Sequence, residues 1–261
     1  MAVTGVIVIA FVLGSAASAA QEPLPDQAST APQAEEAPIP AKRFITNILT
    51  DQKPIFTFPL KAIRGNHWKA VLGVTLVTGG LVIADPYIEP FFRERSGFDS
   101  YQTGPLRGRN TTLAVTLAPV AFYVTGLATH SRHAKNTGLL AAEALVDTQL
   151  LSFVGKQALG RLVPTDIPPH GNYRDTWFKY KGGFTNKGSF PSGHTASAFA
   201  IATVIAERYP KHRWVTWVTY GTATVLSLSR LPTRAHFSSD IFIGAALGYS
   251  ISHFVVLRHP E

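Results

Sequence analysis

The chain has 261 residues, with 24 Lys and Arg against 16 Asp and Glu, a formal net charge of +8 and no cysteine. This length suits one large domain or two small ones, with enough residues for a buried core. Charged residues make up only 15% of the chain, where about 25% is usual for soluble domains, so an ordinary cytosolic protein is disfavoured. Without cysteine, the chain can have no disulfide scaffold, thiolate zinc site, iron–sulfur cluster or cysteine nucleophile.

The charges are unevenly distributed along the chain. Four acidic residues and no basic residue precede Lys42, so the rest of the chain is strongly basic. Such an excess suits a membrane surface, nucleic acid or an anionic substrate. Net charge alone does not choose among these partners, and the choice depends on hydropathy and motifs.

The chain begins with an apolar stretch that ends in a run of small residues. An Ala-Ser-Ala sequence in that run is typical of a cleavage site, which predicts a secretory signal over residues 1–20. An uncleaved N-terminal anchor is the alternative, because no basic residue precedes the apolar stretch. Residues 21–67 are predicted to be a tether and lead-in, since their first part is rich in Pro, Ala and Glu and has no aromatic residue.

Six long apolar stretches alternate with polar loops over residues 68–258, which we predict to be one helical domain. Small and β-branched residues dominate the stretches, but their lengths exceed those of ordinary strands and no hairpin turns separate them, so helices are favoured. The stretches are 70–84, 111–129, 138–155, 193–206, 214–229 and 241–257. We therefore expect an all-α fold, a bundle of about six helices.

Two architectures remain open for this bundle. Three stretches that lack Asp, Glu, Lys and Arg, namely 111–129, 214–229 and 241–257, favour a bundle embedded in a membrane. The alternative is an exported soluble bundle with a very apolar core. Glu143 and Asp147 are four residues apart on one helical face, so they could line a polar interior in either case.

A Pro-Ser-Gly-His sequence stands at the start of one predicted helix. Pro191 suits the first turn, where its missing N–H would have no partner anyway. Ser192, Gly193 and His194 would then present free backbone N–H groups at a helix N-terminus, which is a ready site for phosphate. His194 can also transfer protons near neutral pH. An ordinary helix start with a surface histidine is the alternative.

A second polar segment precedes the last apolar stretch. His236 and Asp240 are four residues apart, one helical turn, so the carboxylate could accept the imidazole Nδ1–H and leave Nε2 free to attack. Arg230 and Arg234 lie just before them, and arginine suits forked recognition of phosphate oxygens. A capped helix start with basic interface residues explains this segment equally well.

Taken together, the two segments resemble two signatures of the type 2 phosphatidic acid phosphatase / vanadium haloperoxidase superfamily. The matching residues are Pro191-Ser192-Gly193-His194 and Ser229-Arg230-x5-His236-x3-Asp240. The resemblance covers about residues 110–257. It implies a helical bundle, with the active site in loops at one end.

The superfamily's third signature, Lys-x6-Arg-Pro, is only partly matched. Lys156 and Pro164 fall at its outer positions, but Val163 stands where the arginine is expected. Arg161, two residues earlier, is the expected substitute.

The resemblance also implies roles for individual residues. His236 would be the nucleophile and form a phosphohistidine, Asp240 would orient it, and His194 would protonate the leaving oxygen. The phosphoryl oxygens would be bound by the set Lys156, Arg161, Ser192, Gly193 and Arg230. No metal or other cofactor is implied.

We expect a metal-independent phosphatase acting on a phosphomonoester or diphosphate, with a lipid such as phosphatidate or a polyprenyl diphosphate as substrate. A membrane bundle would present its pocket near headgroup level, which favours a lipid. Three alternatives are an exported broad-specificity acid phosphatase, a vanadate-dependent haloperoxidase and a catalytically weak membrane protein that binds lipid phosphate. The expected partners are the phosphoester and the membrane, not nucleic acid, and no oligomeric state is predicted.

The basic residues also predict an orientation in the cell envelope. Loops 130–137 and 208–213 would share one side if every stretch spans, and the positive-inside rule makes that side cytoplasmic. The active-site loops then face outside the cytoplasm. If every stretch spans, the residues before 68 lie in the cytoplasm, whereas a cleaved signal would place them outside it. We therefore expect that 70–84 does not span. The alternatives are an uncleaved N-terminal anchor and a soluble bundle.

Overall fold

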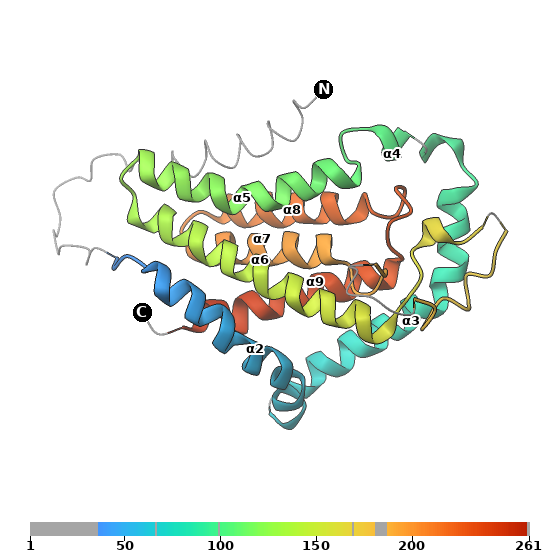
Figure 1. The fold of residues 1–261 in the computed structure, drawn as a ribbon, viewed down its shortest axis with the longest axis horizontal. Helices are drawn as coiled ribbons and strands as arrows, with labels where there is room; N and C mark the ends of the chain where they lie inside the picture. Colours follow the sequence, from blue (N-terminus) through green and yellow to red (C-terminus); the bar gives the residue numbers. More distant parts are fainter. Residues whose placement is uncertain (1–35, 66, 99, 169, 181–186, 260–261) are drawn as a thin grey trace.

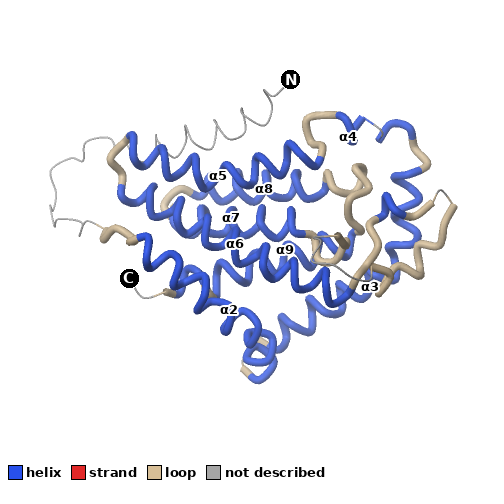
Figure 2. The backbone as a smooth tube through the Cα atoms, in the orientation of Figure 1, coloured by secondary structure: helices blue, strands red, loops and turns tan. Residues whose placement is uncertain are grey.

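The structure is a computed structural model that describes residues 36–259, except 66, 99, 169 and 181–186 (Figure 1). Within these residues all regular structure is helical (Figure 2). The prediction of an all-α fold is therefore confirmed. The predicted signal and the first part of the tether lie outside the described residues.

All six predicted apolar stretches form helices. These are α3 (Trp68–Arg93), α5 (Gly108–Ala128), α6 (Arg132–Leu159), α7 (Gly193–Arg208), α8 (Arg213–Leu228) and α9 (Ser238–Phe254). The described residues add two further α-helices and three 3-10 turns. These are α2 (Ala41–Arg64), α4 (Ser100–Thr103), η1 (Ser96–Phe98), η2 (Pro164–Asp166) and η3 (Val256–Arg258).

Helix α7 lies in the middle of the bundle, packed against α6, α8 and α9 (Figure 1). Two glycines of α9 allow its close approach. A Cβ atom at Gly244 would lie 2.7 Å from the Ser192 carbonyl oxygen, and one at Gly248 would lie 2.1 Å from that of Ala196. A step of four residues along α9, from Gly244 to Gly248, matches a step of four in the same direction from Ser192 to Ala196. Helices α7 and α9 are therefore parallel. Their N-termini therefore meet at one end of the bundle.

Four segments are long and apolar enough to cross a membrane: 68–93, 108–128, 132–166 and 238–258. The first of these, α3, is the most apolar, yet only 6% of its most apolar window is buried inside the protein. Exposed apolar faces of this kind suit contact with lipid. Helix α8 has 16 residues, which is shorter than a typical span.

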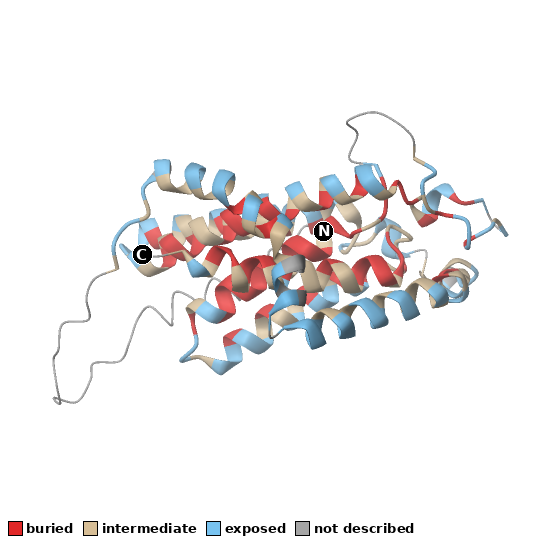
Figure 3. Ribbon diagram, turned by 90° about the horizontal axis from the view of Figure 1, so that it is seen from below, coloured by how far each residue is buried: buried red, intermediate tan, exposed pale blue. Residues whose placement is uncertain are grey.

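The structure changes two expectations about the N-terminal half. The stretch 70–84 belongs to a helix of 26 residues, so its shortness no longer argues against a span. The lead-in contains α2, a helix of 24 residues that hydropathy alone did not indicate. Helix α2 packs against α6, and its Asp51 and Ile55 are buried. Figure 3 shows buried residues gathered in the interior of the bundle and exposed residues on its outer faces.

Candidate active site

Helix ends and loops bring the predicted site residues together at one end of the bundle. Lys156 lies in the last turn of α6, and His194 lies in the first turn of α7. The loop between α8 and α9 carries Arg230 and His236, while Asp240 is in the first turn of α9. The rings of His194 and His236 have centroids 6.2 Å apart. A small group could therefore contact both histidines.

His236 is held with one ring nitrogen occupied and the other available. Its Nδ1 lies 2.8 Å from the carbonyl oxygen of Ser189, so Nδ1 carries the proton and donates it. Nε2 then keeps its lone pair, which is the arrangement a nucleophile needs. Burial lowers the pKa of His236 below its ordinary value. The imidazole is therefore neutral near pH 7.

Asp240 does not hold His236 in the way that the sequence indicated. Its Oδ2 lies 3.8 Å from Nδ1, beyond hydrogen-bonding distance. The carboxylate instead accepts the backbone N–H of Phe237 at 2.8 Å and the hydroxyl of Ser189. Ser189 therefore stands between the two residues, with its carbonyl on the histidine and its hydroxyl on the aspartate. Asp240 acts on His236 through charge and through this loop.

Arg161 also has a different surrounding from the expected one. Its guanidinium forms ion pairs with Asp85 at 2.7 Å and Asp240 at 2.6 Å, and it is 1% exposed. The rings of Trp177 and Phe237 lie 4.4 and 4.0 Å from its centre. The guanidinium group of Arg161 is thus already paired with two carboxylates inside the protein. This geometry does not support Arg161 as a substitute for the arginine missing at Val163.

Three other cations are better placed to meet an anion. Lys156 is 9% exposed and has no hydrogen-bond or ion-pair partner among the described residues. Arg230 is fully buried; one of its terminal nitrogens donates to the Leu106 carbonyl, and the other has no partner in the described structure. Burial lowers the pKa of Arg230 to about 10, so it remains charged. The Nε of Arg107 is likewise buried without a hydrogen-bond acceptor.

Ser192 and Gly193 form the start of α7. The Ser192 hydroxyl accepts the backbone N–H of Thr195 at 3.4 Å, so it caps the helix. Its own N–H donates to the Asp240 carbonyl at 3.1 Å, which joins the two helix starts. The positive end of α7 therefore lies beside the first turn of α9, at Asp240.

His194 is positioned by α5. Its Nε2 lies 2.7 Å from the hydroxyl oxygen of Thr112. Burial, followed by the nearby His236, Arg230 and Lys156, lowers the pKa of His194 to about 3. Burial and the positive charges of Arg230 and Lys156 keep the imidazole neutral in the free protein. An anionic phosphate bound among them would raise the pKa of His194, so that the ring takes up a proton.

An apolar cavity of about 570 Å³ opens beside this end of the bundle, between α5, α7 and α8. It begins at Pro105 and Leu106, and the Leu106 carbonyl is the acceptor of Arg230. Its lining is almost entirely apolar and includes Ala118, Ile201 and Trp217. An alkyl chain would fit this cavity while a polar group lay near the arginine.

Four residues at this end escaped the motif analysis: Asp85, Arg107, Thr112 and Ser189. Asp85 carried a signal, since it is a carboxylate at the end of an otherwise apolar stretch. Ser189 lies just before the Pro-Ser-Gly-His sequence but matches no pattern. Thr112 contacts His194 only because α5 packs beside α7, a contact that no local pattern encodes. Arg107 directly precedes the same helix.

The chain is similar to several known phosphatases. The chain is 30% identical over 118 residues to a lipid A 4'-phosphatase of Porphyromonas gingivalis, covering 45% of this chain and 48% of that protein. It is 40% identical over 84 residues to a lipid A 1-phosphatase of the same organism, covering 29% and 19%. A lipid A 1-phosphatase of Rhizobium etli is 32% identical over 104 residues, covering 40% and 42%.

The chain thus spans less than half the length of each of these relatives. No solved structure matches it significantly. The family model of the PAP2 superfamily matches residues 137–261, the region that contains Lys156, both histidines and Asp240. Over its C-terminal half the chain is therefore similar to the PAP2 superfamily.

Proposed function

We propose that the protein hydrolyses a lipid phosphate ester through a phosphohistidine intermediate, with residues 68–258 as the catalytic unit. The observation that carries this proposal is the arrangement of His236. Its Nε2 is available because Nδ1–H donates to Ser189 at 2.8 Å. Two buried cations, Lys156 and Arg230, face the same space with free hydrogen-bonding capacity.

The first step is attack of the His236 Nε2 lone pair on phosphorus. The bond between phosphorus and the leaving oxygen breaks, and His194 donates a proton to that oxygen. Positive charge on the His236 ring is stabilised through Nδ1–H by the Ser189 carbonyl and, at longer range, by Asp240. Phosphoryl transfer depends mainly on such positioning and on positive charge around the phosphoryl oxygens.

The second step is hydrolysis of the phosphohistidine. Water attacks phosphorus, His194 accepts a proton from the water, and the bond from phosphorus to Nε2 breaks. Inorganic phosphate leaves and His236 returns to its neutral form. His194 loses one proton in the first step and regains one in the second, so the cycle balances.

Lys156, Arg230 and the N–H groups of Gly193 and His194 would surround the phosphoryl oxygens. The arginine missing at Val163 leaves this set one cation short. Arg107 is our candidate for that place, because its Nε is buried without an acceptor and it directly precedes Gly108, which lies beside Arg230. Ser192 acts as the helix cap in this scheme, and Arg161 as a structural residue.

The apolar cavity favours a substrate with an acyl chain. Leu106 lines the cavity and its carbonyl accepts a hydrogen bond from Arg230, so a phosphate at the histidines and a chain in the cavity can belong to one molecule. The relatives are lipid A phosphatases, and we therefore favour a phosphomonoester on an acylated sugar over phosphatidate or a polyprenyl diphosphate. The exposed apolar face of α3 favours the membrane enzyme over an exported soluble acid phosphatase.

We also propose that the active site faces outside the cytoplasm. The short loops at the opposite end of the bundle carry Arg132, Lys135, Arg208 and Lys211, and such loops remain cytoplasmic. The chain lacks cysteine, so single cysteines introduced at exposed Asp175 and Lys211 can be labelled in intact cells. An impermeant maleimide should label position 175 and not position 211; the reverse pattern would contradict the orientation.

The decisive assay measures phosphate release by the full chain in detergent. The substrates are lipid A, phosphatidate, undecaprenyl diphosphate and a small aryl phosphate. His236→Ala should lower the rate of phosphate release by about 10⁴-fold or more, because it removes the nucleophile. His212→Ala, at the opposite end of the bundle, is the matched control and should keep full activity. No release from any substrate, or equal release by both variants, would reject the proposal.

A further inference from the structure

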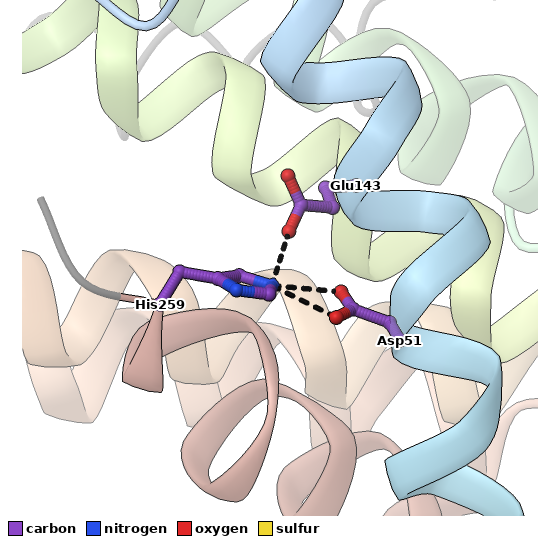
Figure 4. A group of neighbouring side chains, drawn as sticks. All are labelled: Asp51, Glu143 and His259. Carbon is purple, nitrogen blue, oxygen red and sulfur yellow. Dashed lines mark hydrogen bonds and ion pairs between the residues drawn. The ribbon is translucent and has the colours of Figure 1, made fainter.

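A second group of charged side chains lies inside the bundle, away from the histidines. Asp51 of α2, Glu143 of α6 and His259, just after η3, point toward one another (Figure 4). The Nε2 atom of His259 lies 2.9 Å from both oxygens of Asp51 and 3.3 Å from Oε1 of Glu143. Glu143 is 13 residues before Lys156 in α6, which separates this group from the active site by about 20 Å.

The group holds more negative charge than the protein balances. Asp51 and Glu143 are each 1% exposed, and Asp147, one turn further along α6, is fully buried. No Lys or Arg among the described residues forms an ion pair with any of them, which leaves His259 as the one candidate cation. The other donors are uncharged side-chain amides. Buried carboxylates without a counter-charge are strongly destabilising, so protons or a cation must complete the group.

Asp147 gives an independent indication of a ligand. Its Oδ1 accepts the Gln52 amide at 2.8 Å, but its Oδ2 is buried and has no donor in the described structure. Asp147 follows Glu143 by four residues, one turn of α6, so it lies beside the cluster. Buried carboxylate oxygens are rarely left unpaired, and such an atom calls for a partner.

We propose that Asp51, Glu143 and His259, with Asp147 beside them, bind a divalent transition-metal ion such as Zn²⁺ or Mn²⁺. With metal–ligand bonds of about 2.0–2.2 Å, ligand atoms of one ion lie about 2.8–3.6 Å apart. The separations of 2.9 and 3.3 Å between the His259 nitrogen and the carboxylate oxygens fall in that range. Imidazole beside carboxylates favours Zn²⁺ or Mn²⁺ over Mg²⁺ or Ca²⁺.

The ion has a structural role in this proposal. Its ligands come from three segments far apart in the sequence, so it joins α2 and the end of the chain to α6. Metal binding to the folded state alone stabilises that state. The site takes no part in the chemistry at His236 and does not depend on the proposed phosphatase activity.

The test measures metal in the full chain purified in detergent without chelators. Protein stripped with EDTA is then titrated separately with Zn²⁺, Mn²⁺ and Mg²⁺, while bound metal and the temperature of unfolding are recorded. We expect one Zn²⁺ or Mn²⁺ per chain and a rise of several degrees in the unfolding temperature. Glu143→Gln and Asp51→Asn should both abolish binding and this rise.

Glu207→Gln is the matched control, since it makes the same chemical change at the exposed pair of Glu207 and His253, 2.6 Å apart. That variant should bind the ion normally, and so should His236→Ala, which separates this site from the active site. If the wild-type chain binds neither Zn²⁺ nor Mn²⁺, the proposal is wrong and the carboxylates share protons. Unfolding of a variant would not obscure this result, because the wild-type titration decides it.

Discussion

Helix α6 passes through two buried charged regions of opposite sign. At its C-terminal end Lys156 lies near His194 and Arg230, and Arg230 has a buried nitrogen without an acceptor. Near its middle, Glu143 and Asp147 lie with Asp51, and a buried carboxylate oxygen has no donor. In our two proposals, the unbalanced buried charge of each region indicates the sign of its ligand: an anion at the first region and a cation at the second.

Replacing His194 tests the cationic region most directly. His194→Gln should lower the rate with a lipid phosphate by about 10²–10⁴-fold, because a positioned acid contributes that much. The loss should be much smaller with an aryl phosphate, whose leaving oxygen needs little protonation. Steady-state kinetics on both substrates checks this. Equal losses on both would mean that His194 binds the phosphate and transfers no proton.

Replacing Arg161 tests whether this cation has a structural role or binds the phosphate. Arg161→Met should destabilise the protein by about 3–5 kcal/mol, because Asp85 and Asp240 would stay buried without their partner. Arg161→Lys keeps the charge and should cost less. Thermal unfolding measures the stability, and KM of the folded fraction should change little. A large rise in KM at unchanged stability would instead return Arg161 to the phosphate site.

Arg107 and Val163 can be tested as a pair. Arg107→Ala should raise KM by about tenfold, the effect of one phosphate contact in a partly exposed site. Val163→Arg alone should leave activity unchanged or lower, because the place is already filled. In the Arg107→Ala background the same change should restore part of the lost affinity. Failure of Arg107→Ala to alter KM would remove Arg107 from the site.

Acid should weaken the folded state through the two buried histidines. Burial lowers the pKa of both, that of His194 to about 3. An unfolded histidine has a pKa of about 6.5, so below that pH the unfolded chain binds protons that the folded chain does not. The free energy of unfolding therefore has its full value above pH 6.5 and falls below that pH. For His194 the fall is about 1 kcal/mol per pH unit, down to its folded pKa of about 3.

Thermal unfolding between pH 7.5 and 5 measures this slope. His194→Gln should reduce it, while His212→Ala serves as the control from the opposite end. An unchanged slope in His194→Gln would show that the acid sensitivity arises elsewhere, with the acidic cluster as the next place to look.

The local sequence was sufficient to predict the helices and to select most of the residues that the structure brings together in the candidate site. Six apolar stretches became six helices, because apolar length and periodicity act within one segment. Lys156, His194, Arg230, His236 and Asp240 were predicted from short motifs, and the structure brings them to one end of the bundle. The glycines of α9 determine that meeting, since they allow its N-terminus to lie against that of α7.

Tertiary packing decided what each charged side chain meets. Arg161 has carboxylates around it because α3 and α9 pack on both sides, and His236 has the Ser189 carbonyl because a loop folds back. Helix α2 contains Pro54 and Pro59, so local propensity argued against it, and packing on α6 overrode that preference. Asp51 and His259 meet across 208 residues. A helical period acts over a few residues, whereas the balance of buried charge depends on segments that only the folded chain brings together.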